Sequence, residues 1–278
     1  MRMLVSTAIA AALVVVLPAC SQQDGSNETN TAVPAAASLD ALNGSWKVVL
    51  ASMKFTGRPD EFLLKDGSYS CASCIPPLTV AADGQFHPVA DRPYYDSMSV
   101  KMVDDRTVEF NRQKGGKDVS SSRLEASEDG NMLTIRFRNF ANPGSTTEGS
   151  QTAKRVGAAP AGAHAISGQW EPERLADFNE DALDISYQVE GDTVTYTSQG
   201  QSYVATLGGP PVEMKGDVGG TTVKVERADG GIKETFIRGG KEVDVTTIAP
   251  SADGKSLSYT SLDPRDGQGS TFTAERKN

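Results

Sequence analysis

Two cysteines three positions apart are the strongest candidates in this chain for a disulfide, a redox pair or a metal site. Cys71 and Cys74 would form a local disulfide in an exported, oxidising compartment, and this is the pairing that we predict. A thioredoxin-like redox pair is a second hypothesis, but a redox pair of this kind needs a strand-to-helix context and a depressed thiol pKa. Zinc is a third, because His87 follows Cys74 at half of a zinc-finger spacing, although no second histidine lies within reach. Ile75 stands where a c-type haem motif needs histidine, which excludes haem attachment.

The residue types needed for hydrolysis or acid–base catalysis do not form a recognisable set. The chain has 2 histidines: His87 lies beside a proline, and His164 lies in a stretch of small residues. A Ser-His-Asp system needs a positioned base, and no Gly-x-Ser-x-Gly turn occurs in the sequence. Acid pairs such as Asp104-Asp105 fall in expected turns, where solvation explains them better than catalysis. We therefore expect a protein that is not an enzyme, with no cofactor and no metal site.

The first residues of the chain resemble an export signal of a lipid-anchored protein. Arg2 supplies a positive start, and the apolar run from Leu4 to Leu17 is too short to span a hydrocarbon core of about 30 Å. The run ends in Leu17-Pro18-Ala19-Cys20, which resembles the lipobox of bacterial lipoproteins. In a lipobox the cysteine sulfur receives a diacylglycerol, so Cys20 is the predicted lipidation site.

This resemblance implies an exported protein held to a membrane through its N-terminal lipid. We expect residues 1–19 to be a signal peptide and residues 20–39, which are mostly small and polar, to be a flexible tether. Ser21 follows the cysteine, and in Gram-negative lipoproteins this favours delivery to the outer membrane. The expected location is therefore periplasmic, with an outer-membrane anchor. An ordinary secretory signal cleaved nearby is the alternative.

An internal repeat indicates the outline of the fold that must position these residues. Gly44-Ser45-Trp46 recurs as Gly168-Gln169-Trp170, 124 positions later, and the two motifs contain both tryptophans of the chain. A unit that is copied whole is usually a unit that folds. We predict a first β-barrel domain at residues 40–156, a linker of small residues at 157–165, and a second β-barrel domain at 166–278.

Alternating apolar and polar residues dominate both repeats. Leu133, Ile135 and Phe137 alternate with polar side chains in the first repeat, and Val223 and Val225 do so in the second. This period of two is typical of strands with one face on a core, and the many Asp-Gly pairs between such runs favour tight turns. We predict an all-β chain of two tandem antiparallel up-and-down β-barrels, with about eight strands each.

The tryptophan motifs resemble those of lipocalins and related calycins. In that family a Gly-x-Trp enters the first strand of the barrel, and an arginine on the last strand lies across the tryptophan and seals the closed end. Trp46 and Trp170 match the tryptophan, and Arg155 and Arg276 stand where the closing arginines would be. The resemblance implies a lipocalin-like fold with these four barrel-closing residues, stabilised by cation–π attraction. Two core tryptophans in unrelated β domains are the alternative.

Charge and composition narrow the possible partners. The formal net charge is −9, from 27 basic and 36 acidic residues without a basic cluster, and this weighs against nucleic acid as a partner. The leading expectation is non-enzymatic binding of a small apolar or amphipathic ligand, or of a partner protein, at the cell envelope. The alternative is an envelope scaffold or interaction module with filled barrels, and an unrecognised hydrolase or isomerase is a third. Because the cysteine pair and His87 occur only in the first repeat, we expect any special chemistry there.

Overall fold

The computed structural model describes residues 39–142 and 144–277, so the predicted signal peptide, Cys20 and most of the predicted tether lie outside the described residues. Within the described part the secondary structure consists of strands and two short 3-10 helices, η1 (Leu39–Leu42) and η2 (Glu180–Leu183). The strands of the first repeat are β1 (Gly44–Thr56), β2 (Asp60–Lys65), β3 (Ser68–Cys71), β4 (Leu78–Ala81), β5 (Phe86–Pro88), β6 (Ser97–Met102), β7 (Thr107–Lys114), β8 (Lys117–Ala126), β9 (Met132–Asn139) and β10 (Thr147–Val156). Those of the second are β11 (Gly168–Ala176), β12 (Asp184–Glu190), β13 (Thr193–Ser198), β14 (Gln201–Thr206), β15 (Val212–Glu213), β16 (Thr222–Ala228), β17 (Gly231–Arg238), β18 (Lys241–Pro250), β19 (Ser256–Asp263) and β20 (Gln268–Arg276).

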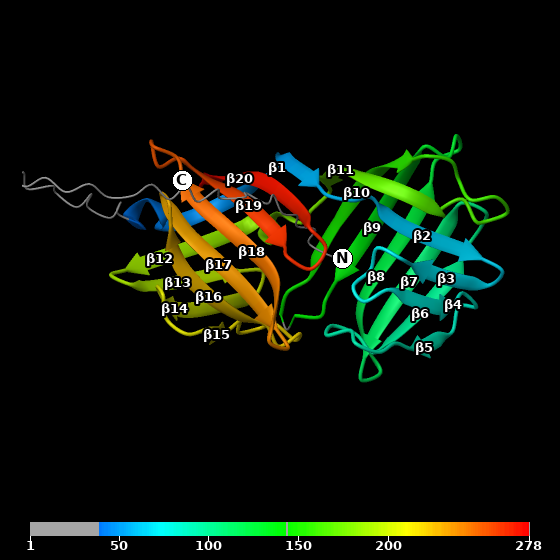
Figure 1. The fold of residues 1–278 in the computed structure, drawn as a ribbon, viewed down its shortest axis with the longest axis horizontal. Helices are drawn as coiled ribbons and strands as arrows, with labels where there is room; N and C mark the ends of the chain where they lie inside the picture. The colour runs from blue at the N-terminus through cyan, green and yellow to red at the C-terminus, as the bar shows by residue number, and fades with distance from the viewer. Residues whose placement is uncertain (1–38, 143, 278) are drawn as a thin grey trace, which may run out of the picture.

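These strands form two antiparallel sheets of ten strands, each curled into a nearly closed barrel (Figure 1). The first barrel has the order β4-β3-β2-β11-β10-β9-β8-β7-β6-β5, and the second has the order β14-β13-β12-β1-β20-β19-β18-β17-β16-β15. The all-β, up-and-down barrel prediction is confirmed. The expected number of about eight strands is too low. The extra strands are short: β4 has 4 residues, β5 has 3 and β15 has 2, which is too few for an alternating pattern to be recognised in the sequence.

The first strand of each repeat belongs to the barrel of the other repeat. In the second barrel β1 pairs with β12 through Trp46–Ile185 and with β20 through Trp46–Arg276. In the first barrel β11 lies between β2 and β10 in the same way. The ranges 40–156 and 166–278 therefore build one barrel each except for their first strands, which are exchanged. The sequence could not predict this, because both strands carry the same Gly-x-Trp motif and fit either position.

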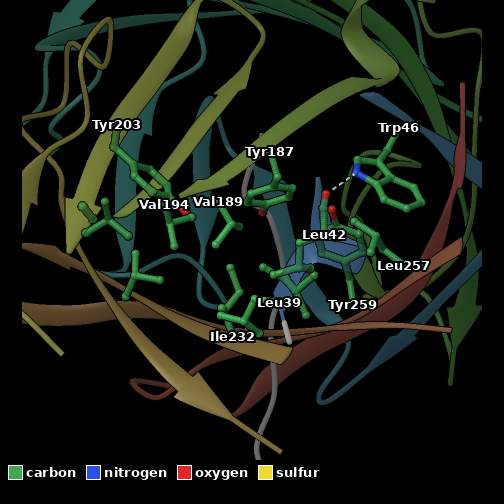
Figure 2. Packing of buried hydrophobic residues seen from close by; sticks show 14 of the residues in the cluster. Leu39, Leu42, Trp46, Tyr187, Val189, Val194, Tyr203, Ile232, Leu257 and Tyr259 are labelled. Carbon is green, nitrogen blue, oxygen red and sulfur yellow. Dashed lines mark hydrogen bonds between the residues drawn. The ribbon is translucent and has the colours of Figure 1, made fainter. Parts of the chain in front are cut away.

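Each barrel has its own hydrophobic core. In the first barrel the core includes Trp170, Leu64 and Phe110, and in the second it includes Trp46, Ile232 and Leu257. Figure 2 shows the second core, where Leu39 and Leu42 of η1 reach into the barrel beside Trp46 and Leu257. Burying each of these side chains stabilises the fold by about 1.5–3 kcal/mol. Since a tryptophan from one repeat is buried in the barrel of the other, the two repeats fold around shared cores.

The tryptophans and arginines form the same closure at one end of each barrel. The Arg276 guanidinium lies 4.1 Å from the Trp46 ring centre, and that of Arg155 lies 4.0 Å from the Trp170 ring centre. Each arginine also donates hydrogen bonds to backbone carbonyls, Arg276 to Asn43 and Arg155 to Ser167. Because of the exchange, each arginine covers the tryptophan of the other repeat. We call these the closed ends.

The glycine of each motif is required by this closure. Gly44 and Gly168 have φ values of +133° and +128°, which L side chains rarely adopt. A Cβ at either position would also collide with the guanidinium of the capping arginine, Arg276 or Arg155. The Gly-x-Trp motif therefore recurs because glycine leaves space for the arginine that covers the tryptophan.

The barrels contact one another through the ends opposite the tryptophans, which we call the open ends. The Tyr94 ring, from the loop after β5, lies 4.8 Å below the Arg238 guanidinium of the second barrel, and its hydroxyl accepts a hydrogen bond from Arg238 Nη2 at 2.5 Å. Thr147 at the start of β10 donates to Gln199 of the second barrel at 3.0 Å. The equivalent loop of the second repeat, residues 214–221, contains no tyrosine, so the contact that fixes one barrel against the other comes from the first repeat.

Candidate functional site

The cysteine pair is a structural crosslink at the open end of the first barrel. Cys71 and Cys74 form a disulfide in the connection from β3 to β4. Arg92 reaches this loop and donates to the carbonyls of Ile75 and Pro76, which ties it to the segment after β5. His87 lies elsewhere, with Nε2 at 2.8 Å from Asp83 Oδ1, so the structure does not bring it to the cysteines.

Neither a cluster of metal-binding side chains nor a membrane-spanning helix is found among the described residues. Residues 39–142 and 144–277 contain no group of three or more His, Cys, Asp and Glu side chains placed to hold a metal ion. The same ranges contain no helix long and apolar enough to cross a membrane. His164, the other histidine, lies at the closed end of the first barrel, with Nε2 at 2.7 Å from the Asp104 carbonyl oxygen. The sequence-predicted residues therefore serve closure and crosslinking, and do not converge on one site.

A buried glutamate in the second barrel is the most unusual polar group of the structure. Glu234 on β17 is 3% exposed and points into the barrel. Its Oε1 atom accepts hydrogen bonds from the Tyr187 hydroxyl at 2.9 Å and from the Tyr203 hydroxyl at 2.5 Å. Two further rings adjoin them, since Tyr196 stacks on Tyr203 with ring centres 5.2 Å apart and Tyr259 is buried nearby on β19. We call Glu234, Tyr187, Tyr196, Tyr203 and Tyr259 the tyrosine–glutamate cluster.

Burial controls the ionisation of this cluster. It raises the pKa of Glu234 to about 7, against the opposing effect of the hydrogen bonds from Tyr203 and Tyr187. The charge of Asp244 raises it further. Burial, and then the nearby Glu234 charge, raise the pKa values of Tyr187, Tyr203 and Tyr259 well above 10.0. The tyrosines therefore remain neutral donors, and the glutamate is the group that titrates near neutral pH.

A second acidic layer lies nearer the open end of the same barrel. Asp244 on β18 accepts hydrogen bonds from Ser261 at 3.0 Å and from Thr246 at 3.2 Å. Burial raises its pKa to about 6 despite these bonds. One strand further, Asp263 is buried and is held by Arg265 through two bonds of 2.8 and 2.5 Å. From the closed end outward, the side chains that line the interior are thus first apolar, then the tyrosine–glutamate cluster, and then the aspartates.

Among the described residues, the first barrel has no carboxyl or tyrosine at the positions that match the tyrosine–glutamate cluster. The strand pairings identify the matching positions. Tyr187 pairs with Gly44 in the second barrel, and Phe62 pairs with Gly168 in the first. In the same way Glu234 pairs with Thr246 in the second barrel, and Phe110 pairs with Ser122 in the first. The five positions of the tyrosine–glutamate cluster correspond in the first barrel to Phe62, Cys71, Leu78, Phe110 and Ile135. The same frame therefore folds around an apolar interior in one copy and around a titratable one in the other. The expectation that special chemistry belongs to the first repeat does not hold for the buried carboxyls.

Two hollows of the described surface lie on the first barrel. One, of about 620 Å³, runs along β7–β10, and its lining includes Arg123, Arg136 and Arg138 with Glu109 and Glu148. The arginines pair with carboxylates, as in Arg123–Glu109 at 2.8 Å and Arg138–Glu148 at 2.7 Å. Another, of about 320 Å³, lies at the closed end beside His164. The tyrosine–glutamate cluster lines neither of them.

This arrangement can hold a proton or accept a hydrogen bond from a bound donor. Protonated Glu234 is a neutral member of a hydrogen-bonded network, and ionised Glu234 accepts bonds from hydroxyl or ammonium donors. None of the five cluster residues was predicted as a site residue from the sequence. A signal was present, because Glu234 is in phase with Ile232 and Phe236 on β17 and so occupies an inward position.

No protein family matches this chain, and no curated protein is significantly similar to it. Any functional conclusion therefore depends on the geometry of the barrels.

Proposed function

We propose that this chain is a non-enzymatic interaction module of the bacterial envelope, tethered through a lipid at Cys20, whose two packed barrels present their outer surfaces to a partner protein. The observation that carries this proposal is the hydrophobic core that packs each barrel. Sixteen buried residues form each core cluster, and the two best-formed hollows of the described residues both lie on the first barrel. A carrier of small apolar molecules needs a concave, mostly apolar cavity that encloses its ligand.

The likeness to lipocalins then concerns the frame and not the ligand-binding activity. The closure of Trp46 by Arg276 and of Trp170 by Arg155 supports that likeness. Small barrels can be filled completely by side chains, so a lipocalin-like frame does not require a ligand.

The hollow along β7–β10 is the surface that best fits a protein partner. Its alternating arginines and glutamates are partly exposed, and such a surface matches a partner with complementary charge pairs rather than an apolar one. A photo-crosslinking residue at Ser121, inside the hollow, should capture a defined partner in the native cells. The matched control is Val204, which is 56% exposed on the outside of the second barrel. Equal capture at both positions would contradict a partner site in the hollow.

A second candidate function is binding of a small molecule with a polar head in the second barrel. The specific observation in its favour is the tyrosine–glutamate cluster, since the first barrel shows that the frame folds without one. Native mass spectrometry of the protein purified from its own cells separates the two proposals. The interaction module predicts the bare mass of the lipidated chain. A retained small molecule that is lost in Glu234→Gln would overturn it in favour of the second candidate.

A further inference from the structure

The two positions that receive the exchanged first strands are built alike. Trp46 Nε1 donates to the Leu42 carbonyl at 2.9 Å, and Trp170 Nε1 donates to the Ile166 carbonyl at 2.8 Å. The capping arginines lie 4.1 and 4.0 Å from the two ring centres. Nothing in these contacts depends on which repeat, or which copy of the chain, supplies the strand.

The segment that docks in the second barrel is held to its own repeat by one short connection. It comprises η1 and β1, residues 39–56, and Leu39, Leu42 and Trp46 are its buried anchors. Gly57, Arg58 and Pro59 join it to β2, and Gly57 has a φ of +114°. A change of direction within these three residues is sufficient to send the segment to a different barrel.

The position of this segment in the chain also permits exchange. It precedes every other described strand, so it can move to a second copy without threading a loop through a barrel. In contrast β11 is joined to β10 on one side and to β12 on the other, so its transfer would require both connections to pass the partner. Connections in proteins avoid such threading.

We propose that residues 39–56 form an exchange element through which two copies of this chain associate, each closing the second barrel of the other. The partner is a second copy because it supplies the same Gly-x-Trp strand together with Leu39 and Leu42 of η1, which are buried in the core of the second barrel. This inference does not depend on the proposed function, since it concerns how the barrels close and not what their surfaces bind.

The exchanged dimer and the monomer contain the same strand pairings, so concentration decides between them. The two forms differ in the path of residues 57–59 and in the entropy of bringing two copies together. A strand on a short connection has an effective concentration of about 1 mM, and that is the scale at which a second copy competes. Refolding at high concentration should therefore trap dimers.

Engineered cysteines test this directly in the full chain carrying Cys20→Ser. Half-buried Lys47 on β1 pairs with exposed Glu275 on β20. Copies with Lys47→Cys are refolded together with copies carrying Glu275→Cys and then oxidised. A disulfide between the two copies can form only where β1 of one copy lies beside β20 of another. Lys47→Cys mixed with Asp229→Cys, an exposed turn residue, measures random collision.

The expected result is a crosslinked pair whose yield rises with protein concentration from about 10 μM to about 1 mM. It should exceed the Asp229→Cys control at least fivefold. A yield equal to the control at every concentration would overturn the proposal. A chain with both Lys47→Cys and Lys154→Cys tests whether β1 can instead take the place of β11 in the first barrel. Lys154 lies beside β11 there, as Glu275 lies beside β1 in the second barrel. A disulfide within that monomer would place β1 in its own barrel, and this would overturn the exchange itself.

Discussion

Replacing Glu234 by glutamine should remove a pH dependence from the stability of the second barrel. The pKa of this carboxyl is raised from 4.5 to about 7 in the folded chain, so the folded state binds the proton more tightly than the unfolded state does. Its contribution is complete below pH 4.5 and is lost as the pH rises through 7. One pKa unit corresponds to about 1.4 kcal/mol, so raising the pH from 5 to 8 should cost the native chain about 2–3 kcal/mol through this group.

The assay is urea unfolding at pH 5 and pH 8, followed by tyrosine and tryptophan fluorescence. In Glu234→Gln the amide oxygen can still accept the bonds of Tyr187 and Tyr203, so packing is preserved while the ionisation is removed. The variant should match the native chain at pH 5 and exceed it by about 2–3 kcal/mol at pH 8. Glu242→Gln, at an exposed glutamate, is the control and should behave as the native chain does. If native chain and Glu234→Gln lose stability in parallel between pH 5 and 8, the reasoning about the buried carboxyl is refuted.

Three further outcomes follow from the exchange and the contacts between barrels. Cleavage at a protease site inserted after Ala161 should leave both fragments together on size-exclusion chromatography, since each fragment supplies a strand to the other's barrel; separation in native buffer would contradict the exchange. Trp46→Ala should lower the free energy of unfolding by about 3–5 kcal/mol in urea titrations, because a fully buried ring is removed; a loss below 1 kcal/mol would show that the closed end is not part of the core. Tyr94→Ala should widen the range of barrel–barrel distances in small-angle scattering, whereas Tyr94→Phe keeps the ring beneath Arg238 and should widen it less; unchanged scattering in Tyr94→Ala would exclude this loop as the clamp.

The frame of the molecule was predictable from sequence because its determinants are local. Strand alternation depends on neighbouring residues such as Leu133, Ile135 and Phe137, and Asp-Gly turns depend on the tolerance of positive φ. The closing residues Trp46, Trp170, Arg155 and Arg276 were expected from the resemblance of the Gly-x-Trp motifs and the late arginines to those of lipocalins. Which tryptophan meets which arginine was not predictable, because both pairings satisfy the same motif.

The tyrosine–glutamate cluster could not be derived in full, because it is assembled from distant strands. Tyr187, Tyr203 and Glu234 lie on β12, β14 and β17, and only barrel closure brings their side chains together. The alternation of residues on β17 indicated that Glu234 points inward. A glutamate at such a position, however, more often marks a shift in strand register or the edge of a sheet. The hydrogen-bond donors that make its burial tolerable are 31 and 47 positions away in the chain.

The two barrels together show that this frame does not need a polar interior to fold. Phe110 and Ile135 fill in the first barrel the positions that Glu234 and Tyr259 occupy in the second. A buried carboxyl lowers stability wherever it is ionised, and an apolar residue of similar size would avoid that loss. The second barrel bears this loss at neutral pH although it also depends on β1 from the other repeat for closure. The exchanged strand and the buried Trp46 contribute to the stability that offsets this loss, so the proton-binding interior of one repeat depends on a segment of the other.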